Sequence, residues 1–226
     1  MKITFYGHST FEIDFNGTKL LFDPFFTGNP LHSNFDTNQL NAKWILVSHG
    51  HGDHVSDVED IAKNNGAKLI SNYEVVNWFE KKGVTGHPLN HGGKYTFDFG
   101  RVKYVNAIHT SSMPDGANGG NPGGFVVWDD DSCFYFAGDT GLTLDMKLIP
   151  MTCPKLDFAI LPIGDNFTMG YEDAAIAAEF IECDTIIGCH YDTFGYIKID
   201  KSKAIEAFKK KNKNLILPSI GESIDI

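Results

Sequence analysis

The chain is poor in positive charge and in cysteine, and it contains no long apolar run. Its 226 residues include 19 Lys and Arg against 29 Asp and Glu, for a formal net charge of −10. Because a nucleic-acid backbone is bound by clustered Lys and Arg, this balance argues against nucleic acid as a partner. No apolar run approaches the roughly 20 residues that span a bilayer, so we expect no membrane segment.

The scarcity of cysteine limits the redox chemistry that the chain supports. No two cysteines form a CxxC pair, so we expect reduced thiols in a cytoplasmic protein. Met1 and Lys2 lead directly into an apolar segment, and no signal peptide is expected. The four cysteines are Cys133, Cys153, Cys183 and Cys189.

The hydrophobic pattern predicts antiparallel strands followed by strand–helix alternation, and this order of elements occurs twice. Asn16 and Gly17 form a typical two-residue hairpin turn near the start of the chain. Trp44–Ser48 is a continuous apolar run, as expected for a strand buried on both faces. We therefore predict an α/β fold in which two similar halves pack sheet on sheet with helices outside, in a single domain of residues 1–226.

Three local features carry further structural predictions. Ser56 and Glu59 have the spacing of a capping box, so a helix is expected to begin directly after the preceding histidine-rich segment. Leu215–Leu217 is expected to be the last strand. The Gly- and Pro-rich loop of residues 110–124 is expected to form either a mobile rim around a substrate or a solvated connection.

The strongest chemical signal is a histidine-rich segment that follows the buried strand. Of the nine histidines, His49, His51 and His54 fall within six residues, with Asp53 among them. Imidazole and carboxylate groups are ligands of Zn, Fe, Mn and Ni. The intervening glycines are expected to let the backbone coil tightly enough for the side chains to converge. A lone histidine in a turn is usually just solvated, but this spacing after a buried strand predicts a metal site.

Other segments must complete such a site, and three polar residues stand where apolar strands end. They are His109, Asp139 and His190, and their shared position predicts that they converge with the histidine-rich segment. The histidines that we interpret as ordinary surface or loop residues are His32, His87 and His91.

Six segments of the chain are similar to motifs of the metallo-β-lactamase superfamily, and they occur in the same order. Within it, the chain resembles the small microbial metal-dependent hydrolases of the branch that includes ascorbate-phosphate lactonase, and the resemblance covers essentially the whole chain. It implies a four-layer αββα sandwich with the site at one edge. The matching segments are residues 7–11, 21–24, 49–54, 109–112, 136–141 and 162–167.

The resemblance also implies two divalent metal ions, with zinc expected first and Mn, Ni or Fe as alternatives. All seven ligands that it calls for are present. The first ion would be held by His49, His51 and His109. The second would be held by Asp53, His54 and His190, and Asp139 would bridge the two ions.

The implied activity is hydrolysis, in which a metal-bound hydroxide attacks an ester, lactone or phosphoester bond of a small molecule. Asp53 would be the catalytic residue that orients this hydroxide and shuttles its proton. Asp23 would hydrogen-bond a ligand histidine, or cap a turn. His8 would face the substrate or be a hydrogen-bonded structural histidine. Two further residues would contact substrate or form a loop turn: Asp165 and Asn166.

Three other functions remain open at this point. A mononuclear iron oxidoreductase of the persulfide dioxygenase type carries a similar histidine motif but needs fewer ligands. A non-catalytic binding protein is disfavoured by the intact ligand set, and a nucleic-acid hydrolase by the acidic charge. The sequence leaves open the substrate, the native metal and whether copies of the chain form a homo-oligomer.

Overall fold

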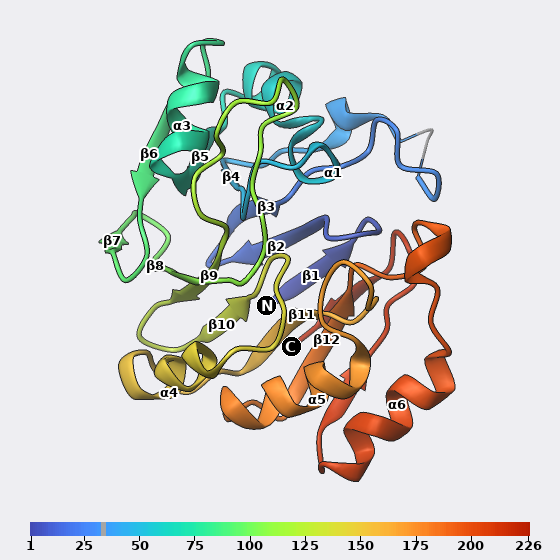
Figure 1. The fold of residues 1–226 in the computed structure, drawn as a ribbon. Helices are drawn as coiled ribbons and strands as arrows, with labels where there is room; N and C mark the ends of the chain where they lie inside the picture. The colour runs from blue at the N-terminus through green and yellow to red at the C-terminus, as the bar shows by residue number, and fades with distance from the viewer. Residues whose placement is uncertain (33–34) are drawn as a thin grey trace.

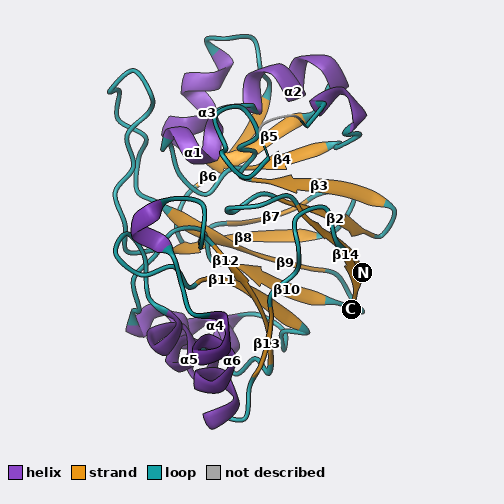
Figure 2. Cartoon of the chain, turned by 90° about the vertical axis from the view of Figure 1, so that its right-hand side faces the viewer, coloured by secondary structure: helices purple, strands orange, loops and turns teal. Residues whose placement is uncertain are grey.

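The computed structural model describes residues 1–32 and 35–226, which form two facing sheets with helices on both outer sides (Figure 1). Figure 2 shows the resulting layers, with α1 to α3 beside the first sheet and α4 to α6 beside the second. This arrangement confirms the predicted αββα sandwich. The helices are α1 (Gly52–Val55), α2 (Val58–Asn65), α3 (Tyr73–Glu80), α4 (Leu148–Thr152), α5 (Tyr171–Phe180) and α6 (Lys201–Lys210), with 3-10 turns η1 (Thr37–Gln39), η2 (Leu144–Lys147) and η3 (Gly195–Ile197).

The first sheet is built from the first half of the chain and closed by its last strand. Its order is β14-β1-β2-β3-β4-β5-β6. The pairs from β1 to β3 are antiparallel and those from β3 to β6 are parallel. The strands are β1 (Lys2–Phe5), β2 (Phe11–Phe15), β3 (Thr18–Phe22), β4 (Trp44–Leu46), β5 (Lys68–Asn72), β6 (Gly86–Leu89) and β14 (Ser223–Asp225).

The second sheet repeats this plan, in the order β13-β12-β11-β10-β9-β8-β7. Its pairs from β7 to β10 are antiparallel and those from β10 to β13 are parallel. The predicted similarity of the two halves is thereby confirmed. The strands are β7 (Lys94–Thr96), β8 (Arg101–Asn106), β9 (Gly123–Trp128), β10 (Cys133–Phe136), β11 (Phe158–Pro162), β12 (Thr185–Cys189) and β13 (Asn214–Ile216).

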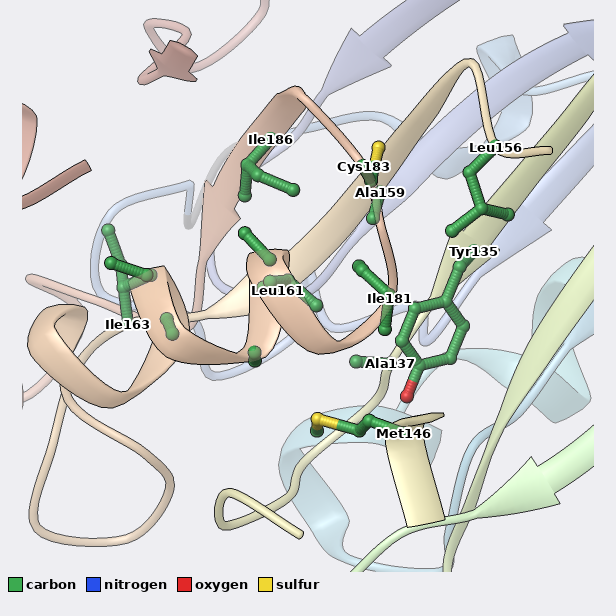
Figure 3. Close-up of a cluster of buried hydrophobic side chains, with 14 of the residues drawn as sticks. Tyr135, Ala137, Met146, Leu156, Ala159, Leu161, Ile163, Ile181, Cys183 and Ile186 are labelled. Carbon is green, nitrogen blue, oxygen red and sulfur yellow. The ribbon is translucent and has the colours of Figure 1, made fainter. Parts of the chain in front are cut away.

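Three apolar layers hold the sandwich together. Between the sheets lies a phenylalanine-rich layer, in which the rings of Phe22 and Phe136 are 4.8 Å apart and those of Phe134 and Phe158 are 5.1 Å apart. A second layer lies between the first sheet and α2 and α3. The third lies between the second sheet and α4 to α6, and Figure 3 shows part of it around Leu161. Within residues 1–32 and 35–226, no helix is long and apolar enough to cross a membrane.

Some local predictions were wrong. The capping box does not form, because α2 begins at Val58 after the N-cap residue Asp57, and the Ser56 hydroxyl donates to the Asp57 carboxylate instead. Leu215–Leu217 is not the last strand, since β14 follows and pairs with β1. The sequence pattern also missed β6, whose Gly and Pro disfavour a strand. As the end of a sheet, it tolerates a proline that a central strand would not.

The layer between the sheets predicts a large loss of stability when a ring is removed from it. We expect Phe134→Ala to lower the free energy of unfolding by about 3–5 kcal/mol, because the side chain is fully buried and its removal leaves a cavity. Tyr95→Ala, at a half-exposed position on β7, is the control, with an expected loss of about 1 kcal/mol or less. Urea unfolding measures both, and equal midpoints would contradict the packing described here.

Candidate metal centre

The histidine-rich segment leaves the carboxyl end of β4 and turns immediately into a helix. His51 is the N-cap of α1, and Asp53 and His54 lie in its single turn. The helix expected after this segment is α2, and the additional short helix α1 within the segment was not expected. The early helix start is physically reasonable, because the carboxylate of Asp53 in the first turn is favoured by the partial positive charge of the helix N-terminus.

The predicted ligands converge from both sheets into two adjacent groups. In one, ring nitrogens of His49, His51 and His109 lie within 4.8 Å of one another. In the other, three predicted ligands lie within the same limit together with His8, which was not predicted as a ligand: Asp53, His54 and His190. A third group, of Asp23, His49 and His54, overlaps both.

Asp139, at the carboxyl end of β10, lies between the two groups. Its Oδ2 is 3.0 Å from His190 Nε2 and 3.3 Å from His54 Nε2. The same oxygen is 3.6 Å from His109 Nε2 and 4.0 Å from His49 Nε2. One buried carboxylate thus contacts histidines of both groups and of both sheets.

Asp23 holds one histidine of each group through a buried hydrogen-bond network. Its Oδ2 is 2.8 Å from His54 Nδ1 and accepts from the Ser48 hydroxyl at 2.6 Å, while its Oδ1 accepts from the Ser48 N–H at 2.7 Å. The Ser48 hydroxyl is also 2.9 Å from His49 Nδ1. Sequence reasoning missed Ser48, because a serine at a strand end carries no pattern of its own.

His8 lies beside the second group of ligands. Its side chain is fully buried, with Nε2 3.1 Å from Asp53 Oδ2 and Nδ1 2.9 Å from Thr193 Oγ1. This environment fits the structural alternative, and contact of His8 with substrate stays a prediction. Burial lowers the pKa of His8 to about 4.

Several of these residues hold an unusual backbone conformation. His8, Asp23 and His190 have φ angles of 54°, 41° and 54°. Residues other than glycine seldom adopt this left-handed region, and such strain concentrates at functional sites. Each of the three follows a strand at the edge where the histidines meet. No sequence pattern signalled these turns.

The electrostatics of the cluster favour a positive charge at its centre. Burial lowers the pKa of His49 well below its usual value. Burial would also lower the pKa of His54, but the carboxylates of Asp139 and Asp53 raise it well above its usual range. Burial would raise the pKa of Asp139, yet His190 and His54 hold it well below. Carboxylates that stabilise a charged histidine would equally stabilise a bound cation.

Unpartnered atoms show that the cluster fits a metal ion. Three of its buried atoms have no hydrogen-bond partner among the described residues: His54 Nε2, Asp139 Oδ1 and His190 Nδ1. An unsatisfied buried polar atom costs about 1–3 kcal/mol. In addition, His49 Nε2 and His51 Nδ1 face each other at 3.0 Å. Converging imidazoles and carboxylates of this kind are suitable ligands for divalent transition metals.

Asp165 and Asn166 lie outside this cluster. They form a turn after β11 in which the Asn166 N–H donates to Asp165 Oδ1 at 2.8 Å, and both are exposed. Their contact with substrate stays a prediction. Two exposed aromatic residues near this turn escaped the sequence reasoning, Phe167 and Tyr196, whose rings meet edge to face at 6.2 Å.

The loop of residues 110–124 is anchored beside the histidines. The N–H of Gly50 donates to Ser111 Oγ at 3.1 Å. On the other side, Asn72 Nδ2 donates to the Gly119 carbonyl at 2.8 Å, which ties the loop to the start of α3. These contacts place the loop at the rim of the candidate centre.

The sequence matches known families over most of its length. Residues 2–190 match the model of the β-lactamase superfamily domain. A UPF0173 metal-dependent hydrolase of Flavobacterium johnsoniae is 58% identical over 226 residues and one of Christiangramia forsetii is 59% identical over 227, each covering 100% of both chains. The chain belongs to the UPF0173 metal-dependent hydrolase family.

A solved structure is similar to the chain over nearly its whole length. Igni18, a metallo hydrolase from the hyperthermophilic archaeon Ignicoccus hospitalis, is similar with a TM-score of 0.89 and 29% identity, covering 99% of this chain and 97% of that one. The resemblance to the metallo-β-lactamase superfamily is therefore confirmed, as is the prediction of a metal-dependent hydrolase.

The two glycines of the motif differ in what they permit. A Cβ on Gly50 would lie 2.5 Å from Met113 Sδ and 3.2 Å from the Ser112 carbonyl oxygen, whereas one on Gly52 would meet nothing within 4 Å. Neither glycine has a positive φ. The expectation that both are needed for backbone coiling was wrong: Gly50 is needed for the close approach of the loop, and Gly52 is not.

This difference gives a matched pair of substitutions. Gly50→Ala is expected to lower the free energy of unfolding by about 1–3 kcal/mol, because the added methyl group overlaps Met113 and the backbone at Ser112. Gly52→Ala should change it by about 0.5 kcal/mol or less. Denaturant unfolding of both proteins decides, and equal stabilities would show that the loop does not pack against Gly50.

Proposed function

We propose that this metal-dependent hydrolase holds two divalent ions, with zinc as the first choice and Mn, Ni or Fe as alternatives. The carrying observation is the position of Asp139 Oδ2, within 4.0 Å of histidines from both ligand groups. The first trio, His49, His51 and His109, would hold the first ion. The second trio, Asp53, His54 and His190, would hold the second ion, and Asp139 would bridge the two. Two complete trios favour this over the single-iron oxidoreductase.

Ions bound there would lower the pKa of a coordinated water to near 7 and polarise the oxygen of the bond to be cleaved. The protein's own contribution is orientation. Asp23 and Ser48 fix the rings of His49 and His54, so the ligands are set before a substrate arrives. Buried, preorganised ligands avoid reorganisation during the reaction.

Asp53 is the candidate catalytic residue. Its side chain is 29% exposed, in contrast to the 3% of Asp139, so it faces the approach to the centre. Burial would raise the pKa of Asp53, but His54 and His8 hold it well below its usual range, and the group is ionised at neutral pH. An ionised carboxylate beside the attacking water accepts its hydrogen bond, aligns it and receives its proton.

The proposed reaction is hydrolysis of an ester, lactone or phosphoester bond in a small molecule. The net charge of −10 disfavours a nucleic-acid substrate. A cytoplasmic location agrees with the four unpaired cysteines. The fold by itself does not choose among these bonds, because one scaffold supports many chemistries.

Metal analysis tests the two-ion centre. The wild-type protein should bind about two zinc ions per chain, and His51→Ala about one, because that substitution removes a ligand from one trio only. Removing the ions with a chelator should lower Tm by several degrees, since ions that bind only the folded state stabilise it. A wild-type protein that saturates with one ion would contradict the proposal.

A hydrolysis screen tests the activity. The purified protein, loaded with Zn, Mn or Ni, is assayed on lactones, thioesters and phosphodiesters, and at least one class should be cleaved. With that substrate, Asp53→Ala should lower kcat about 10²–10⁴-fold through loss of the positioned acceptor. Unaltered turnover in the variant would remove Asp53 from its proposed role, and no cleavage with any metal would count against the hydrolytic assignment itself.

A further inference from the structure

His8 joins two members of the second ligand group, although the sequence motif for metal binding does not include it. Its Nε2 is 3.1 Å from Asp53 Oδ2, and its backbone carbonyl accepts the N–H of His190 at 2.8 Å. The rings of His8 and His190 are 4.1 Å apart. One residue of the turn between β1 and β2 thus contacts a side chain from α1 and both the backbone and the ring of a residue that follows β12.

The hydrogen bonds of the His8 ring fix the position of its proton. The carboxylate of Asp53 only accepts hydrogen bonds, so the proton between them belongs to Nε2 of His8. The Nδ1 atom then accepts from the hydroxyl of Thr193 at 2.9 Å, a shorter contact than the 3.4 Å between that hydroxyl and the Tyr191 carbonyl. The order Thr193, His8, Asp53 is the arrangement by which an outer residue orients a metal-binding carboxylate.

His8 is also close enough to bind an ion directly, since it belongs to the second group of possible ligand atoms. Direct binding through Nε2 would break its hydrogen bond to Asp53, and binding through Nδ1 would break the one to Thr193. The Nε2 atom of His8 donates to Asp53, which is itself a proposed ligand, whereas Nε2 of His49 has only another ring nitrogen, that of His51, within hydrogen-bonding distance. A role in positioning therefore fits the geometry of His8 better than a role as ligand.

We propose that His8 is a positioning residue for the second metal ion, which holds Asp53 through its ring and His190 through its backbone carbonyl. The proposal rests on the two-ion centre of the proposed function. It assigns His8 to one ion only, because its contacts are to the second trio. His49, in the first trio, is held instead by Ser48.

The test compares three substitutions by calorimetric titration of the metal-free protein with zinc. His8→Asn removes the ring but keeps a residue type that tolerates the left-handed φ of 54°. Thr193→Val keeps His8 and removes only the hydroxyl at its Nδ1. His87→Asn is the control, because its ring packs against Tyr95 on β7, outside the cluster. Circular dichroism checks that each variant folds.

We expect His8→Asn to weaken one of the two zinc-binding events by about 10–100-fold and to leave the other within about threefold. Thr193→Val should weaken the same event by a smaller factor, and His87→Asn should change neither. In a double-mutant cycle, His8→Asn added to Asp53→Ala should weaken binding little further than Asp53→Ala alone, since His8 acts through Asp53. If His8→Asn fails to fold, the Thr193→Val titration decides.

Each contrary result has a distinct meaning. Two ions bound with unchanged affinity by His8→Asn, both events weakened equally, or additive effects with Asp53→Ala would each overturn the positioning role while leaving the two-ion centre intact. A wild-type protein that binds one ion would overturn the two-ion proposal, and this one with it. A failure to find a hydrolysed substrate would not change the zinc titrations. The proposed hydrolytic activity and the proposed role of His8 can therefore fail separately.

Discussion

The structure of the candidate centre depends on one buried carboxylate. Asp139 enters from β10 of the second sheet and lies within 4.0 Å of histidines carried by both sheets. A buried charge is tolerated only when it is paired, and here the partners are imidazoles that gather around the same point. The two halves of the sandwich therefore meet at this edge through polar groups, whereas elsewhere they meet through phenylalanine rings. A cation at that point would balance the carboxylates and satisfy atoms that are otherwise without partners.

A second set of contacts holds the candidate ligand side chains in place. Asp23 and Ser48 orient one histidine of each trio, and His8 connects Asp53 with His190. Several of these residues hold left-handed backbone, a strain that the packed sheets on either side sustain. The rigid sandwich thus supplies the precision that a metal centre requires, and Asp53 keeps a side chain that is 29% exposed at the same edge.

The predictable part of the fold followed from local patterns. The turn at Asn16 and Gly17 located the β2–β3 hairpin, and the apolar run from Trp44 located β4, since a strand buried on both faces is apolar at every position. The edge strands β6 and β14 were missed because an edge position relaxes the demand for apolar and β-branched residues. The capping box at Ser56 failed for a different reason: Asp57 accepts hydrogen bonds from the backbone at Phe26 and Thr27, and this tertiary demand displaced the local one.

The sequence by itself determined the chemistry of the centre, because histidines and carboxylates at this spacing after a buried strand have few other uses. It also determined the repeated order of strands and helices, and hence the sandwich. Only the tertiary structure decided which residues form hydrogen bonds with the candidate ligands and orient them. Ser48 and Thr193 are ordinary residues in the chain, and His8 lies far from Asp53 in sequence. Their roles arise when seven-stranded sheets bring separate strand ends within hydrogen-bonding distance, and no local pattern encodes a contact of that range.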